Sequence, residues 1–399
     1  MNRSGRLTTV RERLNWIDWL KVLVVVGAFV FHAAQPFVLT TWLINDSDKS
    51  LVLSLLSGFG YLFGMPLMFF LAGAATWLAV ERRGIGGHTG LRLRRLLVPL
   101  VLGLVILSPP QAWVAHLSAG GQGGPLEFLN EYLGGMEFYP NPRWFGDYGY
   151  HLWFLAFLFL YVLLTLPVLS WLRARRAAGD DLRIGAVANR RWGLFWLLLP
   201  VMGVQLILSP LFPDYRDWAD FALWLSYFLI GMGAMADERV MPAILRRRRV
   251  TLWLAPVVAL GYLPFLVFGS PLDLEHAPGI TLAGLAYVGW RSALAWVMTL
   301  VFVGLAATYF TARPRFLGWA SDTVLPFYVL HHPVVVVVAA VVVGLSVGLW
   351  VKFGLILVIA GATTVGLCVA LDLATSAMSG RFGPGQDRAV PASPAEAQP

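Results

Sequence analysis

A lysine and a histidine, Lys21 and His32, stand eleven residues apart in the first long apolar stretch of the sequence. Eleven helical residues turn through about 1100°, or three turns and about 20°, so the two side chains share one face about 16 Å apart. Asp18 lies three residues before Lys21, near enough on a helix to pair with it. An imidazole titrates near neutral pH and can accept a proton from a hydroxyl group, which makes His32 a candidate general base. A core histidine bonded to a neighbouring helix, and a lysine extended to the membrane interface, also fit these two positions.

Further histidines lie in two other apolar stretches, at His151 and at the adjacent pair His331 and His332. Adjacent helical residues project about 100° apart, so we expect at most one of the pair to face a given site. No cysteine or carboxylate cluster accompanies them, so the sequence does not predict a metal centre. With Trp153 and Tyr328, these histidines are candidates to line a substrate cavity, although His151 and Trp153 also fit the aromatic belt of a membrane protein.

The elements that carry these residues are apolar to an extent that excludes an ordinary soluble enzyme. Of the 399 residues, 58% are hydrophobic and only 13% are charged, whereas soluble domains carry about 25% charged residues. The mean hydropathy is +0.69. A single cysteine and the lack of a glycine repeat exclude a disulfide scaffold and a collagen. The composition predicts a membrane protein whose spans are each about 20 residues long.

Ten apolar stretches are long enough to cross a bilayer, which predicts an all-α, polytopic helix bundle of about ten transmembrane helices. Glycines and Pro66 in the second stretch predict a break within it, where the freed backbone groups must be satisfied inside the protein. The first stretch follows a basic segment and is interpreted as a retained signal anchor. The approximate bounds are 15–39, 51–80, 96–116, 151–172, 194–212, 219–236, 251–269, 288–311, 323–343 and 348–375.

The basic residues alternate from one side of these stretches to the other. Twenty-four of the 30 Lys and Arg residues fall in the termini and loops of one side, and only three fall in the opposite loops. Because translocation disfavours Lys and Arg, we expect the basic side, and with it both termini, to be cytoplasmic. The net charge of +8 then records topology, and it does not predict a nucleic-acid partner. Arg291 and Lys352, near the outer ends of spans, are interpreted as interface residues.

The opposite side has two longer loops, about 117–150 and 270–287, with carboxylates, aromatic residues and glycines. Such loops suit a carbohydrate or another polar acceptor, and they also fit plain solvated connections. The chain is thus expected to divide into a cytoplasmic N-terminal segment at 1–14, a transmembrane domain at 15–375 and a disordered cytoplasmic tail at 376–399.

Six short motifs follow one another along this map of spans: Lys21 and His32 with ten residues between them, Gly64 to Gly73, Arg92-x-x-Arg95, Pro109-Pro110-Gln111, His151-Leu152-Trp153-Phe154, and Leu325 to Pro333. In order and spacing they resemble the acyltransferase 3 family of integral membrane O-acyltransferases, and most of all its glucan-succinylating branch. The resemblance covers about 11–375. Two positions depart from the family pattern, since Lys21 replaces a more usual Arg and Ala72 replaces a Ser. Lys cannot make the bidentate contacts of Arg.

The resemblance implies an enzyme with acyl-CoA as donor co-substrate, a carbohydrate hydroxyl or another hydroxyl as acceptor, and no metal. His32 would be the general base, and Lys21 would hold the donor or stabilise developing negative charge. Arg92 and Arg95 would bind the coenzyme A phosphates, although topology alone also accounts for arginines there. The remaining candidates would line the substrate path: Asp18, His151, Trp153, Tyr328, His331 and His332.

The resemblance also implies a multi-pass protein of the bacterial plasma membrane that carries out O-acetylation or another modification of a glucan. The acyl group, acetyl or succinyl, is left open. The main rival class is a transporter or flippase of a glycan or small polar molecule, because broken helices and polar groups inside the membrane also suit a carrier. No internal repeat is visible in the sequence, and a carrier has no need of the His32 and Arg-x-x-Arg combination. A sensor or structural protein would leave the polar groups without a purpose.

Overall fold

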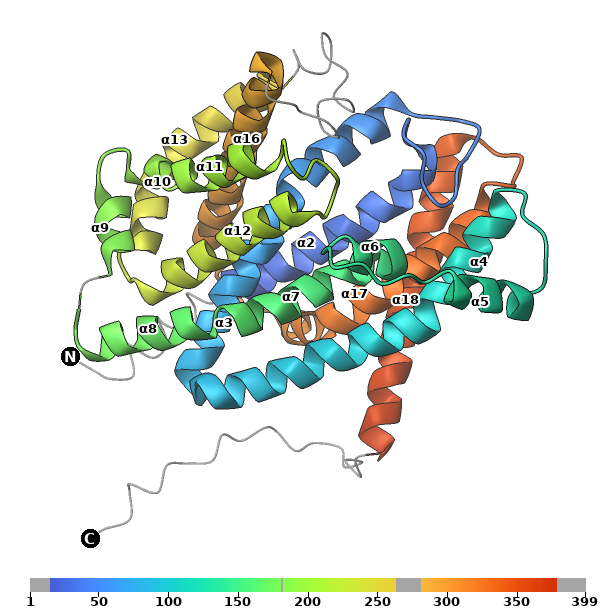
Figure 1. Ribbon diagram of the computed structural model, residues 1–399, viewed down its shortest axis with the longest axis horizontal. Coiled ribbons are helices and arrows are strands. Elements are labelled where there is room, and N and C mark those ends of the chain that lie inside the picture. Colours follow the sequence, from blue (N-terminus) through green and yellow to red (C-terminus); the bar gives the residue numbers. More distant parts are fainter. Residues whose placement is uncertain (1–14, 181, 263–280, 379–399) are drawn as a thin grey trace.

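The computed structural model describes residues 15–180, 182–262 and 281–378, and every regular element in these ranges is a helix (Figure 1). The predicted segment 1–14, the part of the predicted tail after 378 and the outer-loop residues 270–280 lie outside the described residues. The elements are α2 (Asn15–Ala34), η1 (Gln35–Phe37), α3 (Leu51–Leu102), η2 (Gly103–Leu107), α4 (Ser108–Ser118), α5 (Pro125–Gly134), α6 (Trp144–Gly149), η3 (Tyr150–Leu152), α7 (Trp153–Leu164), α8 (Leu166–Ala177), α9 (Arg183–Asn189), α10 (Gly193–Trp196), α11 (Leu198–Leu208), α12 (Trp218–Ala236), α13 (Val240–Leu260), α16 (Leu282–Tyr309), α17 (Arg315–Val342) and α18 (Leu349–Met378).

Seven helical segments within the described ranges are long and apolar enough to cross a membrane. This confirms the predicted class, a helical membrane bundle. Two predicted stretches, 51–80 and 96–116, belong to a single 68-residue helical segment, Leu51–Ser118. The predicted stretch 194–212 corresponds to shorter apolar helices at Gly193–Leu208. The count of ten spans therefore stays a prediction.

The long helix α3 folds back on itself at Gly84, at the lower left of Figure 1. Gly84 has φ 72° and ψ 169°, a conformation that a residue without Cβ adopts readily. The helix runs unbroken through Pro66, so the break predicted around that residue is wrong. A proline is tolerated inside a membrane helix where neighbouring groups satisfy the freed carbonyl.

Helices α3 and α12 approach each other closely through two glycines. A Cβ atom on Gly73 would lie 1.9 Å from the carbonyl oxygen of Phe228, and one on Gly231 would lie 2.0 Å from that of Phe70. Only glycine allows these backbones to come so near, as is common for helices packed in membranes. Gly73 closes the apolar motif that began at Gly64, which gives that part of the motif a structural reason.

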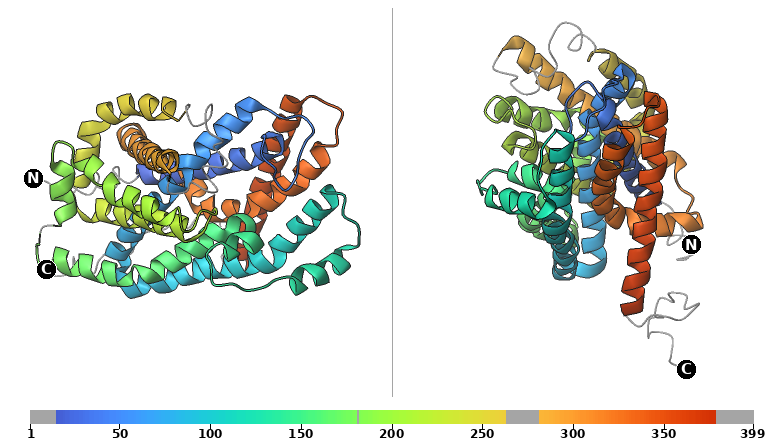
Figure 2. Two further views of the ribbon diagram at one scale, coloured as in Figure 1. Left: turned by 45° about the horizontal axis from the view of Figure 1, so that its top comes forward. Right: turned by 90° about the vertical axis from the view of Figure 1, so that its right-hand side faces the viewer.

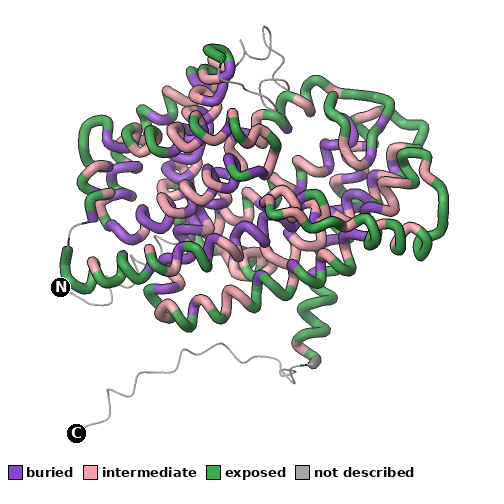
Figure 3. The backbone as a smooth tube through the Cα atoms, in the orientation of Figure 1, coloured by how far each residue is buried: buried purple, intermediate pink, exposed green. Residues whose placement is uncertain are grey.

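The core lies between these helices, in the middle of the bundle (Figure 3). Large aromatic side chains fill it, among them Trp77, Tyr161, Tyr227 and Trp296. Helix α18 instead stands along one side of the molecule, and its lower end is exposed (Figures 2 and 3). The exposed residues of α18 are largely apolar, as expected for a helix in contact with lipid.

Loops that were predicted to share a side of the membrane contact each other. We call the end of the bundle that carries the arginines of 82–95, 173–191 and 239–249 the arginine-rich end. There the Arg239 guanidinium donates to the carbonyl of Leu182, 2.7 Å away, and so joins the start of α13 to the segment before α9. At the opposite end, the Asn141 amide donates to the carboxylate of Asp217 at 2.7 Å. Each of these two contacts joins segments that the alternation of basic residues assigns to the same side.

Asp237 fixes the turn between α12 and α13. Its carboxylate accepts hydrogen bonds from the backbone of Gly185 at 2.8 Å and from the Arg239 guanidinium at 2.9 Å. Burial alone would raise the pKa of Asp237, but the hydrogen bonds from Arg239 and Gly185 outweigh it and hold this pKa below its ordinary value.

Candidate active site

Four histidines from three separate elements form one cluster. His32 comes from the last turn of α2, His151 from η3, and His331 and His332 from α17. The His32 ring lies 4.5 Å from that of His332 and 5.4 Å from that of His331, measured between centroids. The His151 ring lies 4.6 Å from that of His332 and 5.3 Å from that of His331. The expectation that at most one of the adjacent pair faces the site is wrong, because the rings of both His331 and His332 lie against those of His32 and His151.

Gln111 fixes the orientation of His332. Its amide nitrogen donates to the carbonyl of Leu107 at 2.7 Å, so its amide oxygen is turned to Nδ1 of His332, 2.5 Å away. An amide oxygen only accepts hydrogen bonds, so Nδ1 carries the proton and the lone pair of an uncharged ring is on Nε2.

Backbone carbonyls orient the two other buried histidines in the same way. His331 Nδ1 donates to the carbonyl of Tyr328 at 2.7 Å, and His151 Nε2 donates to that of Val329 at 3.1 Å. The opposite nitrogens, Nε2 of His331 and Nδ1 of His151, are buried without a hydrogen-bond partner among the described residues. The Tyr328 hydroxyl donates to the carbonyl of His151, which ties α17 to η3. The cluster thus has ring nitrogens, on His331 and His151, that are free to accept a proton within its buried interior.

His32 differs from the other three histidines in its exposure. His151, His331 and His332 are buried, whereas His32 is only partly so. Its Nδ1 is buried and has no hydrogen-bond partner in the described part of the chain. His32 is therefore the histidine that an incoming molecule can reach most readily.

The loop after η1 brings Trp42 against this histidine. The Trp42 ring lies 6.3 Å from that of His32 and 5.6 Å from that of His332. The loop is held by a buried ion pair in which Lys352 Nζ lies 2.7 Å from the Asp46 carboxylate, with side-chain exposures of 7% and 0%. Lys352 also donates to the carbonyl of Val343 at 2.9 Å. The interpretation of Lys352 as an interface residue is wrong, because its ammonium group is buried against the carboxylate of Asp46.

Lys21 and Asp18 form the predicted ion pair, at 2.9 Å, and both side chains are half-buried. They share α2 with His32, and the unbroken helix confirms that Lys21 and His32 lie on one face. No hydrogen bond, ion pair or ring contact given by the described residues joins either of them directly to the histidine cluster.

Arg92 and Arg95 lie on the returning part of α3, where Arg92 is half-buried and Arg95 is exposed. His88, one turn earlier, is buried, and its Nε2 has no hydrogen-bond partner among the described residues. Arg173 and Arg176 line a cavity of about 240 Å³ between α3 and α8. Cationic side chains thus concentrate at this end, away from the cluster of four histidines.

A larger cavity, of about 350 Å³, lies between the ends of α2, α3, α12 and α16 that are opposite to the arginine-rich end. Phe31, which lines it, has its ring 5.2 Å from that of His32. Arg291 and Asp220 also line it and form an ion pair at 3.3 Å, with side-chain exposures of 15% and 7%. Arg291 therefore pairs with a carboxylate inside the protein, and its interpretation as an interface residue is wrong.

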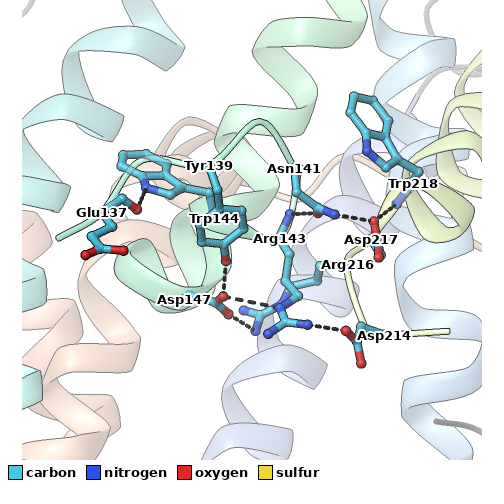
Figure 4. Close-up of polar contacts among 10 residues, drawn as sticks. All are labelled: Glu137, Tyr139, Asn141, Arg143, Trp144, Asp147, Asp214, Arg216, Asp217 and Trp218. Atoms are coloured by element: carbon cyan, nitrogen blue, oxygen red, sulfur yellow. Dashed lines mark hydrogen bonds and ion pairs between the residues drawn. The ribbon is translucent and has the colours of Figure 1, made fainter. Parts of the chain in front are cut away.

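A network of charged side chains borders this cavity (Figure 4). Arg143 pairs with Asp214, a residue of the cavity wall, and with Asp147 at 3.3 Å. The Tyr139 hydroxyl donates to Asp147. Burial and this hydrogen bond raise the pKa of Tyr139 to about 12. The network locks the segment before α12 against the loop that precedes α6.

None of these clusters has the geometry of a metal site: no group of three or more His, Cys, Asp or Glu side chains among the described residues is placed to hold an ion. The groups that the described residues offer for chemistry are imidazole, guanidinium and ammonium groups.

Residues 14–373 match the model of a family described as an acyltransferase domain, Acyl_transf_3. The chain belongs to this acyltransferase family. It is also similar to glucans biosynthesis protein C of Escherichia coli K12 and of strain SMS-3-5, with 24% identity over 380 residues in each case. The alignments cover 87% of this chain and 89% of each relative. No solved structure matches the chain.

The family match confirms the resemblance drawn from the sequence motifs and establishes the protein as a membrane acyltransferase. Of the predicted residues, the acyltransferase brings together His32, His151, Tyr328, His331 and His332. The roles assigned to these residues stay predictions.

Trp153 is buried in an aromatic core instead of the histidine cluster. Its ring stacks on that of Trp224 at 4.7 Å and meets that of Tyr215, a cavity-lining residue, at 6.0 Å. Sequence reasoning did not single out Trp42 or Gln111 for a role at the cluster. Only Gln111 carried a signal, as a polar residue directly after two prolines in an apolar stretch.

Proposed function

We propose that this acyltransferase moves an acetyl or succinyl group from acyl-CoA, bound at the arginine-rich end, to a hydroxyl of a carbohydrate that arrives from the opposite side. The observation that carries the proposal is the position of His32. It lies on the same helix face as Lys21, within a cluster of oriented histidines, and its neighbour Phe31 lines the 350 Å³ cavity. The printed name of the E. coli relatives, which refers to glucans, supports a carbohydrate acceptor.

In the proposed reaction, His32 is the general base. It removes the proton from the acceptor hydroxyl as the oxygen attacks the thioester carbonyl carbon. The tetrahedral intermediate collapses with loss of coenzyme A as a thiolate, which takes the proton back from the imidazolium of His32. The new ester bond and the free thiol of coenzyme A account for all atoms and electrons.

The neighbouring histidines would support His32 in this role. Because Gln111 keeps the Nδ1 proton of His332 in place, the Nε2 lone pair of His332 is available to the cluster. Gln111, Tyr328 and Val329 together hold the rings in fixed orientations, which lowers the cost of arranging them during the reaction. Trp42 would exclude water from the same space.

Cations would hold the donor. Arg92 and Arg95 would bind phosphates of coenzyme A, since guanidinium groups make bidentate contacts with phosphate oxygens. Lys21, paired with Asp18 and about 16 Å along α2 from His32, would help to hold the donor on its way to the histidine cluster. Asp18 thus acts by positioning Lys21.

We further propose that the arginine-rich end faces the cytoplasm of a bacterium, with both termini on that side and about ten spans in the plasma membrane. The alternation of basic loops supports this orientation, because Lys and Arg remain on the cytoplasmic side. Acyl-CoA would then be drawn from the cytoplasm.

The test uses the full chain reconstituted in lipid nanodiscs with labelled acetyl-CoA or succinyl-CoA and a glucose oligosaccharide. Release of coenzyme A together with a labelled ester on the sugar supports the proposal. Saturable uptake of the labelled sugar by proteoliposomes, without thioester cleavage, would contradict it and favour a carrier.

A further inference from the structure

We propose that the 350 Å³ cavity between α2, α3, α12 and α16 is the acceptor subsite of this acyltransferase and that it binds a neutral, hydroxyl-rich sugar. The inference rests on the proposed acyl-transfer function and assigns its second substrate to particular side chains.

The location of the cavity fits the reaction. Phe31 lines it and directly precedes His32, with 5.2 Å between the two rings. Gln35, one turn later on the same chain segment, also lines it and donates to the carbonyl of Phe31 at 3.1 Å, which holds this wall in place. A sugar in the cavity therefore lies one side chain, that of Phe31, away from the proposed base. The volume is within the range of small-molecule sites.

The ion pair of Arg291 and Asp220 gives the cavity wall both donors and acceptors. Taking two charges out of water costs several kcal/mol per ion, so a buried ion pair is expensive to keep for stability alone. Its guanidinium donates hydrogen bonds and its carboxylate accepts them, while each sugar hydroxyl can do both. A hydrocarbon ligand would leave these groups desolvated and is therefore disfavoured.

Three tyrosines complete the lining, Tyr61, Tyr215 and Tyr287. The rings of Tyr61 and Tyr215 lie 5.1 Å apart. A tyrosine presents an apolar ring and a polar hydroxyl, a combination that matches the C–H faces and hydroxyl edges of a pyranose. An aromatic and polar wall of this kind sets the orientation of a bound ligand as well as the affinity for it.

The charge of the wall favours a neutral ligand. Asp214 and Asp220 line the cavity, and each is paired with an arginine, Arg143 and Arg291 respectively. These guanidinium groups already hold carboxylates of the protein, so a phosphate or carboxylate ligand would compete with Asp214 and Asp220 for them. A neutral sugar meets no such penalty.

The lip of the cavity is held in a strained conformation. Arg216 has φ 69°, which is uncommon for a residue with a Cβ atom. Its backbone N–H donates to the Asp220 carboxylate at 3.0 Å, and its guanidinium lies 5.0 Å from the centre of the Tyr215 ring. Such strain collects where a site must hold a definite shape. Asp220 thus fixes both the lip and Arg291.

The experiment measures transfer from acetyl-CoA or succinyl-CoA, whichever the enzyme uses, to two glucose trisaccharides, maltotriose and laminaritriose. The protein is the full chain in nanodiscs, and released coenzyme A and the sugar ester are both followed. We expect Arg291→Gln to raise the KM for the sugar at least tenfold relative to the KM for the donor. Tyr287→Phe, which removes one oxygen and keeps the ring, should raise the same ratio about threefold. Glu127→Gln is the control, because Glu127 is exposed on α5 and lines neither this cavity nor the one between α3 and α8.

The outcomes separate this inference from the proposed function. Thioester cleavage with no stimulation by either trisaccharide, or variants whose KM ratio equals that of wild type, would overturn the subsite and leave the donor reaction standing. An enzyme that acylates glucuronic acid oligosaccharides with a lower KM than glucose oligosaccharides would overturn the neutral-ligand argument. Failure of wild type to cleave any acyl-CoA would overturn the proposed function and this inference together.

Discussion

Loss of either partner of the buried ion pair between Lys352 and Asp46 should destabilise this protein strongly. The side chains meet at 2.7 Å although the residues are 306 positions apart in the sequence. Asp46 also accepts a hydrogen bond from the backbone of Asp48 at 2.8 Å, and Lys352 donates to the carbonyl of Val343 at 2.9 Å. The pair therefore joins the loop after η1 to the first turn of α18.

We expect Asp46→Asn and Lys352→Met each to lower the free energy of unfolding by about 3–5 kcal/mol, because each leaves the partner charge buried and uncompensated. The double variant should lose clearly less than the sum of the two, since it leaves neither charge alone. The single variants should also lower acyl transfer, because the anchored loop carries Trp42 to His32.

Unfolding by denaturant in mild detergent, with tryptophan fluorescence as the signal, gives these free energies. Glu238→Gln is the matched control, because it removes a carboxylate that pairs with Arg176 at 3.1 Å but is 86% exposed. It should cost no more than about 1 kcal/mol. If Asp46→Asn is as stable as the control, the reasoning about burial is refuted.

Three further predictions concern other parts of the structure. Gln111→Met removes the acceptor for Nδ1 of His332 and should lower kcat by about tenfold, equivalent to about 1.4 kcal/mol; unchanged turnover would show that this orientation does not matter. Gly73→Ala should prevent close packing of α3 on α12 and lower the thermal midpoint by far more than Gly64→Ala, where a Cβ meets nothing within 4 Å; equal midpoints would contradict the packing. Because the pKa of Asp237 is depressed by folding, its stabilisation is present above its unfolded-state pKa of about 3.9 and is lost as pH falls through the folded value. The stability gap between wild type and Asp237→Asn should therefore narrow from pH 6 to about pH 3, and a gap that widens would contradict this.

Local patterns were sufficient to predict the helical membrane class and part of the site. Hydropathy identified the long apolar helices, and the spacing of Lys21 and His32 placed them on one face of α2 because a helix has a fixed repeat. The acyltransferase family followed from the order of short motifs.

Contacts between distant segments were not predictable in this way. The meeting of His32 and of His151 with His331 depends on how three elements pack, and spacing within one element carries no information about that packing. The same holds for Lys352, because its partner Asp46 lies 306 positions away in the sequence. Each of these pairings is a long-range contact with no local signature.

The bend in α3 shows a different limit. Proline and glycines near Pro66 suggested a break, yet the chain turns at Gly84. Pro66 and Gly84 are both compatible with a bend, and the packing of α3 on its neighbours selects Gly84.

The central claim is that His32 is the general base of an acyl transfer, and its removal is the most direct test. In nanodiscs, His32→Ala that inserts and folds as wild type does should lose transfer at least about 100-fold. His116→Ala, a histidine outside the cluster, should keep wild-type transfer. A His32→Ala enzyme that acylates sugars at the wild-type rate would contradict the account.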